Sequence, residues 1–310
     1  MGRRNIIAGL AAGLLGLAAS PLFARCENVA PSARMQNTPR EFVGQTMDEI
    51  VQRGYLTIAV YDAFPPYSWL GDDGKPQGID IGVGRILAES LGVEARFNFV
   101  LAGEDLKIDL MSYVWRGSVL DEPVSNLMMR VPYNADFACQ VDQVAFTGQY
   151  AAEQIAVAYG LAAYPDAVPS DLPRHEGGPV PAFFRYDSVA VENDSIADFY
   201  LTAFPGGQIG PNIHRFPSMA EAMVAVAGGE VMAAMGPQSQ LQYGAEEGVA
   251  VHTPPLPQFA LAKWTLGIAV HQSHRDLAYA LDDAIAAALT DGRIEKVYAD
   301  LGLDFIPPER

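Results

Sequence analysis

The fold class follows from residues 55–92, which read YLTIAVYDAFPPYSWLGDDGKPQGIDIGVGRILAESLG. From Leu56 to Tyr61 the apolar residues follow an alternating pattern, and this period of two predicts a strand. The pair Pro65-Pro66 and the turn residues Asp72-Asp73-Gly74 interrupt the pattern. From Ile79 to Leu91 the apolar residues recur at helical spacing. The order strand, loop, turn and helix predicts an α/β fold.

The loop within this stretch carries four aromatic side chains, Tyr61, Phe64, Tyr67 and Trp69. A loop that leaves the carboxyl end of a strand and leads to a helix lies where open α/β sheets bind ligands. Aromatic side chains are typical of ligand pockets and of protein interfaces. The sequence leaves two interpretations open: these residues form a ligand or partner surface, or they only pack the interior of a lobe.

Length and charge limit the function classes. The chain has 310 residues, of which 50% are hydrophobic and 18% are charged, so it can bury the cores of two lobes of ordinary size. Its formal net charge of -17 argues against a nucleic-acid or anionic-lipid partner, because phosphates repel carboxylates. The acidic surface suits either docking on a basic partner or simple solubility.

Residues 1–24 have the pattern of a secretory signal peptide. Arg3 and Arg4 precede an apolar run from Ile6 to Ala19 that is too short to span a bilayer. We therefore expect export to the periplasm by the general or the twin-arginine route, with an uncleaved membrane anchor as the alternative. Residues 25–44 are polar without a sustained period and are predicted to form a tether.

The chain has two cysteines, Cys26 and Cys139. In an oxidising compartment they can pair and tie the mature N-terminus to the first lobe. The sequence alone does not decide between this disulfide and two free thiols.

The rest of the chain is predicted to form two α/β lobes. Lobe 1 continues with strand and helix patterns at residues 95–100, 104–117, 124–131, 264–270, 276–289 and 293–301. Lobe 2 follows an extended run at 146–159, with a strand at 181–184, a helix at 189–204 after the cap Asp187-Ser188, a capping box at 218–221 and a strand at 231–235. The predicted boundaries are 45–150 with 263–310 for lobe 1 and 151–262 for lobe 2. Two strands joining two lobes predict a hinge.

Five short motifs carry a resemblance to a known family. They are Phe64-Pro-Pro-Tyr-Ser-Trp69, the turn from Asp73-Gly74 to Gly78-Ile79-Asp80, Leu91-Gly92, Leu266-Gly-Ile-Ala269 and Asp291-Gly-Arg-Ile294. From about residue 45 onward the chain resembles the periplasmic solute-binding proteins of family 3, the amino-acid-binding type. The resemblance implies a two-lobed periplasmic binding protein-like fold (type II), with a two-strand hinge, and a non-enzymatic role without a cofactor.

The residues that hold an amino acid in that family do not match here. The family binds the α-carboxylate with an Arg that follows an Asp on the third strand, and here Ala138 and Asn126 stand near those positions. The Asp that meets the ammonium group of the ligand falls at Gly236 or Pro237. A carboxylate would therefore lack its charge-assisted bidentate partner.

A narrower resemblance rests on four segments: Asp105-Leu-Lys107, Val114-Trp-Arg-Gly-Ser-Val-Leu120, Asn126-Leu-Met-Met-Arg-Val-Pro132 and Tyr298-Ala-Asp-Leu-Gly-Leu-Asp-Phe-Ile-Pro-Pro308. They look like the binding-protein-like J components that accompany PQQ-dependent methanol dehydrogenases (MxaJ/XoxJ type). This resemblance implies an accessory factor that contacts a PQQ-dependent alcohol dehydrogenase or its cytochrome.

Three functional hypotheses follow. The leading one is a periplasmic accessory factor of a PQQ-dependent alcohol (methanol) dehydrogenase system, which binds a protein partner or a small ligand in the cleft between its lobes. The main alternative is a receptor that delivers a small organic solute to an ABC-importer permease. The third is an enzyme of the cyclohexadienyl dehydratase kind, which would need an acid or a base in the cleft.

The predicted ligand- or partner-binding residues supply apolar area through aromatics and anion contacts through arginines. They are Tyr61, Phe64, Tyr67, Trp69, Trp115, Arg130 and Arg185. His271 and His274 lack further metal ligands at the usual spacing and are predicted to be surface histidines.

Overall fold

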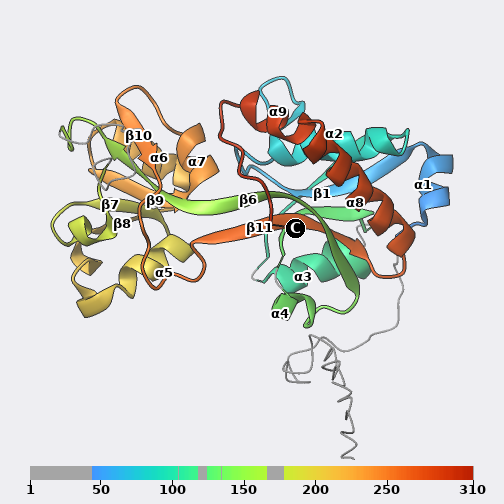
Figure 1. The fold of residues 1–310 in the computed structure, drawn as a ribbon, viewed down its shortest axis with the longest axis horizontal. Helices are drawn as coiled ribbons and strands as arrows, with labels where there is room; N and C mark the ends of the chain where they lie inside the picture. The colour runs from blue at the N-terminus through green and yellow to red at the C-terminus, as the bar shows by residue number, and fades with distance from the viewer. Residues whose placement is uncertain (1–43, 104, 118–123, 134, 166–177, 310) are drawn as a thin grey trace, which may run out of the picture.

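The protein is a two-lobed α/β molecule in its computed structural model, which describes residues 44–103, 105–117, 124–133, 135–165 and 178–309 (Figure 1). The predicted signal peptide, the tether up to residue 43 and Cys26 lie outside the described residues, so they stay predictions. No helix in the described part of the chain combines the length and the apolar character that a membrane crossing needs.

One large mixed sheet runs through both lobes. Within the described residues its strand order is β4-β1-β5-β11-β6-β9-β7-β8, and β10 also pairs with β6. The strands are β1 Tyr55–Tyr61, β4 Glu94–Val100, β5 Leu127–Pro132, β6 Val144–Gly160, β7 Val189–Glu192, β8 Ile213–Phe216, β9 Ala233–Pro237, β10 Val249–His252 and β11 Lys263–His271. A separate two-stranded sheet joins β2 Trp69–Leu70 to β3 Pro76–Gln77.

Lobe 1 contains β1 to β5 and the helices α1 Met47–Arg53, α2 Ile79–Ser90, α3 Leu106–Leu110, α4 Ala135–Ala138, α8 Arg275–Thr290 and α9 Arg293–Ala299. The alternating pattern of strand β1 matches the two faces of the sheet. Leu56, Ile58 and Val60 pack in the core beneath α2, α8 and α9, whereas Ala59 faces the core beside α3. Burial on both faces is typical of a strand in a parallel arrangement, and β1 pairs parallel with β4 and β5.

Lobe 2 contains β7 to β10 and the helices α5 Ile196–Thr202, α6 Met219–Ala227 and α7 Gln238–Tyr243. Strands β7, β8 and β9 are parallel, and buried residues pack on both faces of this part of the sheet. Ser218 caps α6 by accepting a hydrogen bond from the backbone N–H of Glu221, as the capping-box pattern predicts.

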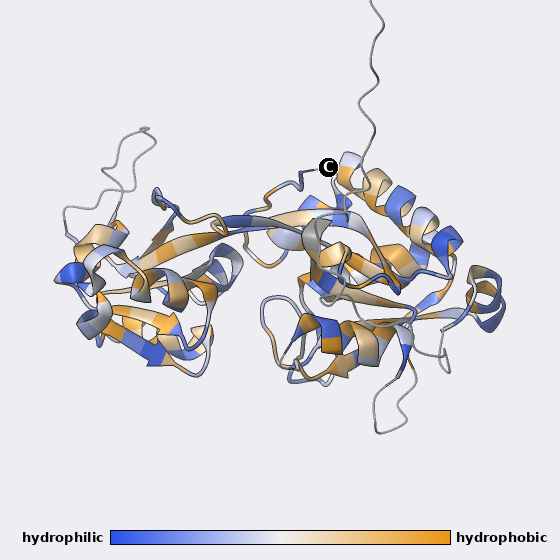
Figure 2. Ribbon diagram, turned by 90° about the horizontal axis from the view of Figure 1, so that it is seen from below, coloured by the Kyte–Doolittle hydropathy of each residue, from blue (hydrophilic) through white to orange (hydrophobic). Residues whose placement is uncertain are grey.

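The lobes are joined by β6 and β11, which run between them side by side (Figures 1 and 2). Strand β6 changes partner along its length. It pairs with β11 up to Gln154, and from Ile155 onward it pairs with β9 of lobe 2. The strand is therefore a shared element of both lobes.

Several local predictions were wrong. The predicted strand at 181–184 is a 3-10 helix, Pro181–Arg185, and the residues predicted to start a helix at Val189 form strand β7 instead. The segment Val189-Ala-Val191 is fully buried between β8 and β9, and this setting favours a strand with β-branched residues. The helix starts only at Ile196, after Ser195 caps it.

His271 and His274 are buried, so the prediction of surface histidines was wrong. Strand β11 continues to His271, which pairs with Val144 in the interior, and the Nδ1 atom of His271 accepts a hydrogen bond from the backbone N–H of Ser273. In the described part of the chain, no group of three or more His, Cys, Asp or Glu side chains is placed to hold a metal ion.

Candidate functional site

The aromatic loop after β1 folds back against the start of α2. The backbone N–H groups of Ile79 and Asp80 donate to the carbonyl oxygens of Pro66 and Tyr67, at 3.0 and 2.9 Å. Gly78 makes this approach possible, because a Cβ atom there would lie 2.2 Å from the Tyr67 carbonyl oxygen and the residue has φ +121. The loop is thus fixed by backbone contacts and presents its rings in a defined arrangement.

Arg130 lies at the centre of these rings. It lies at an irregularity in the pairing of β5 with β11, adopts φ +61 and has only 9% of its surface exposed. Its guanidinium carbon lies 3.0 Å from the centroid of the Tyr67 ring and 5.7 Å from that of Phe64. The Nη2 atom is 3.6 Å from Oε2 of Glu153, and Nη1 has no hydrogen-bond partner among the described residues.

Glu153 is a buried carboxylate on β6, with 1% of its surface exposed. Its Oε2 atom accepts a hydrogen bond from the Tyr67 hydroxyl at 2.8 Å, on the lobe 1 side. Its Oε1 atom accepts from the backbone N–H of Ser239 at 3.3 Å, in helix α7 of lobe 2, and from its neighbour Gln154 at 3.2 Å. One carboxylate therefore contacts both lobes.

A second buried carboxylate, Asp80, lies on the lobe 1 side of this cluster. Its Oδ1 atom accepts a hydrogen bond from the Tyr150 hydroxyl at 2.8 Å. Burial raises the pKa of Asp80 to about 6, although the positive charge of Arg130 and the hydrogen bond from Tyr150 both lower it. Burial lowers the pKa of Arg130, but the nearby Tyr67, Asp80, Tyr150 and Glu153 outweigh this effect and raise it overall.

A cavity of about 590 Å³ opens between the two lobes beside β11. Pro132 and Tyr133 line it from lobe 1 and Ile196 lines it from lobe 2. The segment that enters β11 and the C-terminal segment supply the rest: Ala260, Leu261, Lys263, Trp264, Thr265 and Glu309. Lys263 and Glu309 are the charged residues of the lining, and they form an ion pair at 3.2 Å. Most of the other lining residues are apolar.

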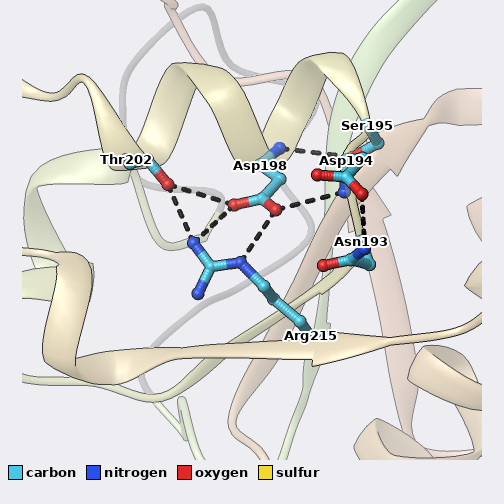
Figure 3. A network of polar contacts seen from close by, with 6 residues as sticks. All are labelled: Asn193, Asp194, Ser195, Asp198, Thr202 and Arg215. Carbon is cyan, nitrogen blue, oxygen red and sulfur yellow. Dashed lines mark hydrogen bonds and ion pairs between the residues drawn. The ribbon is translucent and has the colours of Figure 1, made fainter.

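The lobe 2 wall of this cavity is held by a polar network at the start of α5 (Figure 3). Arg215 of β8 donates to both carboxylate oxygens of Asp198, each at 2.8 Å. Asp198 also accepts from Thr202 at 3.0 Å and from the backbone N–H of Asp194 at 3.3 Å. This network fixes the loop that leads into Ile196.

Four of the seven predicted site residues come together around the guanidinium: Tyr61, Phe64, Tyr67 and Arg130. Tyr61 also donates to Asp109 at 2.8 Å. None of the seven is among the residues that line the cavity.

The other three predicted residues lie apart from one another. Trp69 contacts Tyr243 of lobe 2, with ring centroids 5.5 Å apart. Trp115 is buried in the lobe 1 core, at the end of a π-helix, Met111–Trp115. Arg185 is exposed on lobe 2, with its guanidinium 5.7 Å from the Phe204 ring.

Sequence reasoning missed Glu153, Asp80, Tyr133 and Trp264. Glu153 left one visible signal, because it is the one charged residue in the mostly apolar run Ala151-Ala-Glu-Gln-Ile-Ala-Val157. A charged residue in such a strand needs a partner in the fold. Tyr133 and Trp264 left none, since the cavity brings together segments distant in sequence.

In the resembling family, charged residues bind the amino acid at the positions that are Asn126, Ala138 and Pro237 in this chain. Here these three residues do not provide a charged group for a ligand. The side-chain oxygen of buried Asn126 accepts from Arg53 at 3.0 Å, from the Thr57 backbone at 2.9 Å and from the Thr57 hydroxyl at 2.7 Å. Ala138 in α4 and Pro237 at the end of β9 carry no charge.

Comparison with known proteins gives the fold. No family model matches the chain. The L-cystine-binding protein TcyJ of Escherichia coli K12 is 31% identical over 93 residues, which are 28% of this chain and 34% of that protein. The chain thus matches about a third of the length of this curated relative.

Two solved structures align over most of this chain. An ancestral cationic amino acid solute-binding protein (AncCDT-1) has a TM-score of 0.64 at 20% identity, covering 83% of this chain and 99% of that one. A solute receptor for L-cysteine from Neisseria gonorrhoeae has a TM-score of 0.54 at 19% identity, covering 83% and 93%. The predicted fold class is confirmed: the chain has the two-lobed type II fold of periplasmic amino-acid-binding proteins.

Proposed function

We propose that this protein is a non-enzymatic periplasmic solute-binding protein that holds a small organic solute between its lobes. The observation that carries the proposal is the interlobe cavity of about 590 Å³, lined by Tyr133 of lobe 1, Ile196 of lobe 2 and Trp264 of the joining strand. Its size falls in the usual range of small-molecule pockets, about 300–1,000 Å³. A solute that touches both lobes stabilises one arrangement of the hinge, which is how a receptor signals occupancy to a permease.

The lining favours a solute with an apolar or aromatic body. Tyr133, Leu261 and Trp264 offer apolar area, and the Lys263–Glu309 ion pair offers one polar contact of each sign. The residues at the clamp positions of the resembling family provide neither a free Arg for a carboxylate nor a free Asp for an ammonium group. The proposed solute is therefore not a free α-amino acid.

The relatives support the solute hypothesis more than the dehydrogenase hypothesis. TcyJ binds L-cystine by its name, and the two aligned structures are described as an amino-acid solute-binding protein and a receptor for L-cysteine. One ancestral structure is also described as a precursor of cyclohexadienyl dehydratase. Lys263 and Glu309 are the charged side chains lining the cavity, and their mutual pairing gives no isolated acid or base for such chemistry.

The test is a thermal-shift screen of the mature protein against small organic solutes, with free amino acids included. A solute at about 100 times its dissociation constant adds about 2.7 kcal/mol of stability. Tyr133→Ala should weaken binding of a hit at least about tenfold, because it removes an aromatic wall of the cavity. Tyr279→Ala, an exposed tyrosine on α8, is the matched control and should leave the affinity unchanged. Equal affinities for the two variants would place the solute elsewhere.

A role beside a PQQ-dependent alcohol dehydrogenase remains the second candidate. The observation that favours it is the lack of amino-acid clamps, together with the sequence resemblance of residues 105–132 and 298–308 to the J components. Co-purification of the tagged mature protein with a quinoprotein dehydrogenase or its cytochrome, in the absence of any solute that shifts the melting temperature, would establish this candidate over the first.

A further inference from the structure

A buried carboxylate, that of Glu153, lies at the centre of the contacts between lobe 1 and helix α7. Glu153 lies where β6 leaves β11 and joins β9, and its two oxygens point to opposite lobes. Around it, Gln154 donates to Gln238 of α7 at 2.6 Å, and Trp69 contacts Tyr243. Gln242 of α7 also accepts from the backbone N–H of Asp304 at 3.1 Å.

Donors from both lobes surround the carboxylate of Glu153. The Arg130 guanidinium and the Tyr67 hydroxyl approach Oε2 from lobe 1, and the Ser239 backbone N–H approaches Oε1 from lobe 2. A guanidinium with hydroxyl and amide donors is the usual environment of a bound carboxylate. All of these groups are buried, so they would be costly to leave without an acceptor.

We propose that Glu153 is a built-in carboxylate ligand that does between the lobes what the acidic group of a solute would do. It occupies the anion receptor of Arg130, Tyr67 and Ser239, holds α7 against lobe 1, and excludes solute carboxylates from this position. The inference goes beyond the proposed function, because Glu153, Arg130, Tyr67 and Ser239 are not among the residues that line the cavity. It rests on the contacts of Glu153 alone and can fail separately from the solute hypothesis.

Chemical rescue tests the proposal directly. Glu153→Ala removes the carboxylate and leaves the three donors in place, and we expect a loss of about 10 °C in melting temperature. Acetate or propionate should then recover at least half of this loss, while acetamide at the same concentration and ionic strength should not. Wild type and Glu89→Ala, an exposed glutamate on α2, should respond to none of the three compounds.

Two results would overturn it: rescue by acetamide as large as that by acetate, or an acetate effect of equal size in wild type. Asp80 still interacts with Arg130 in the variant, which helps the variant to fold. If Glu153→Ala does not fold, Glu153→Gln supplies the second measurement. Hydrogen exchange of the Ser239 amide should be faster in that variant by at least about tenfold, since a neutral amide oxygen is a weaker acceptor. An unchanged exchange rate would contradict the proposal.

The two hypotheses give distinguishable failures. If no solute shifts wild type but carboxylates rescue Glu153→Ala, the proposed function fails and the inference stands. If a solute binds wild type and Tyr133→Ala weakens that binding, but carboxylates do not rescue Glu153→Ala, the inference fails and the proposed function stands.

Discussion

Arg130 combines two costly features, a positive φ of 61 and a nearly buried charge. A non-glycine residue in this backbone region costs about 1–2 kcal/mol. The pairing of β5 with β11 shifts register between Gly267 and Ala269, so Arg130 leaves the regular alternation of the strand. Its guanidinium then reaches Tyr67 and Glu153, whose attraction offsets part of the cost. Such a strained, charged position is more typical of a working site than of a scaffold.

Asp80 makes stability depend on pH in a defined direction. Its pKa is raised from 3.8 to about 6 by burial, so the folded protein binds this proton more tightly than the unfolded chain. The stabilisation is fully present below pH 3.8 and is lost as the pH rises to about 6. Urea unfolding should show a decrease of up to about 3 kcal/mol over this range from this group.

Asp80→Asn should remove that part of the pH dependence. Asp142→Asn, a change at an exposed carboxylate, should keep the wild-type slope. Identical slopes in wild type and Asp80→Asn would show that Asp80 does not titrate in this range.

Gly78 and Gly74 lie in the same turn region and differ in surroundings. Gly78→Ala places Cβ 2.2 Å from the Tyr67 carbonyl oxygen, whereas Gly74→Ala meets no atom within 4 Å. We expect Gly78→Ala to lower the free energy of unfolding by at least about 3 kcal/mol and Gly74→Ala by about 1 kcal/mol. Denaturant titrations of the two variants measure the difference. A cost at position 78 no greater than that at position 74 would mean that the loop can move away from α2.

At the scale of elements, the network around Asp198 connects α5 to β8. Arg215 and Thr202 lower the pKa of Asp198, and they outweigh the opposite effect of its burial. The ionised Asp198 therefore stabilises the folded protein above pH 3.8, and this contribution is lost as the pH falls below that value. Because the pair is charge-assisted and its Arg215 side chain is 40% exposed to solvent, Asp198→Asn should cost about 1–2 kcal/mol at neutral pH.

The measurement for this variant is unfolding at several pH values, combined with hydrogen exchange of residues 193–196. Exchange in this loop should increase in Asp198→Asn and stay unchanged in Asp142→Asn. If the loop exchanges at the wild-type rate, the network is not what holds the cavity wall.

Element predictions succeeded where the signal was local. Residues 55–92 contain strand, turn and helix patterns that hardly depend on distant contacts, and β1 and α2 follow them closely. The helix predicted from Val189 was wrong because the apolar segment Val189-Ala-Val191 fits a buried strand as well as a buried helix. Only its neighbours β8 and β9 decide between the two.

At the scale of the molecule, the site depends on contacts that no local pattern encodes. The aromatic loop was predicted, and three of its four rings gather beside Arg130. A cleft between the lobes was predicted but its lining was not, because Pro132, Ile196 and Glu309 are far apart in the sequence and meet only in the folded molecule. The fold as a whole was predictable from the family resemblance, whereas the change of partner along β6 was not.

A disulfide between Cys26 and Cys139 would fasten the N-terminal segment to lobe 1. Cys139 is buried and carries no free thiol, while Cys26 lies outside the described residues, so the pairing stays a prediction. We expect the denatured, unreduced mature protein to show no reactive thiol. We also expect Cys26→Ala and Cys139→Ala to be destabilised equally, by about 2–5 kcal/mol, with the double variant no worse. If the denatured protein shows two reactive thiols in the absence of reductant, the two cysteines are not paired.

Strand β11 lies between β5 and β6, at the middle of the large sheet, yet it is made after all the other strands. During synthesis, β5 must wait for residues 263–271 before its second edge is covered. Lobe 2, whose strands β7 to β9 pair with one another, can gain its structure sooner. Folding of the whole chain is therefore expected to end with the insertion of a central strand. The slow step carries a large loop-closure cost and leaves two unpaired strand edges exposed to aggregation until it is complete.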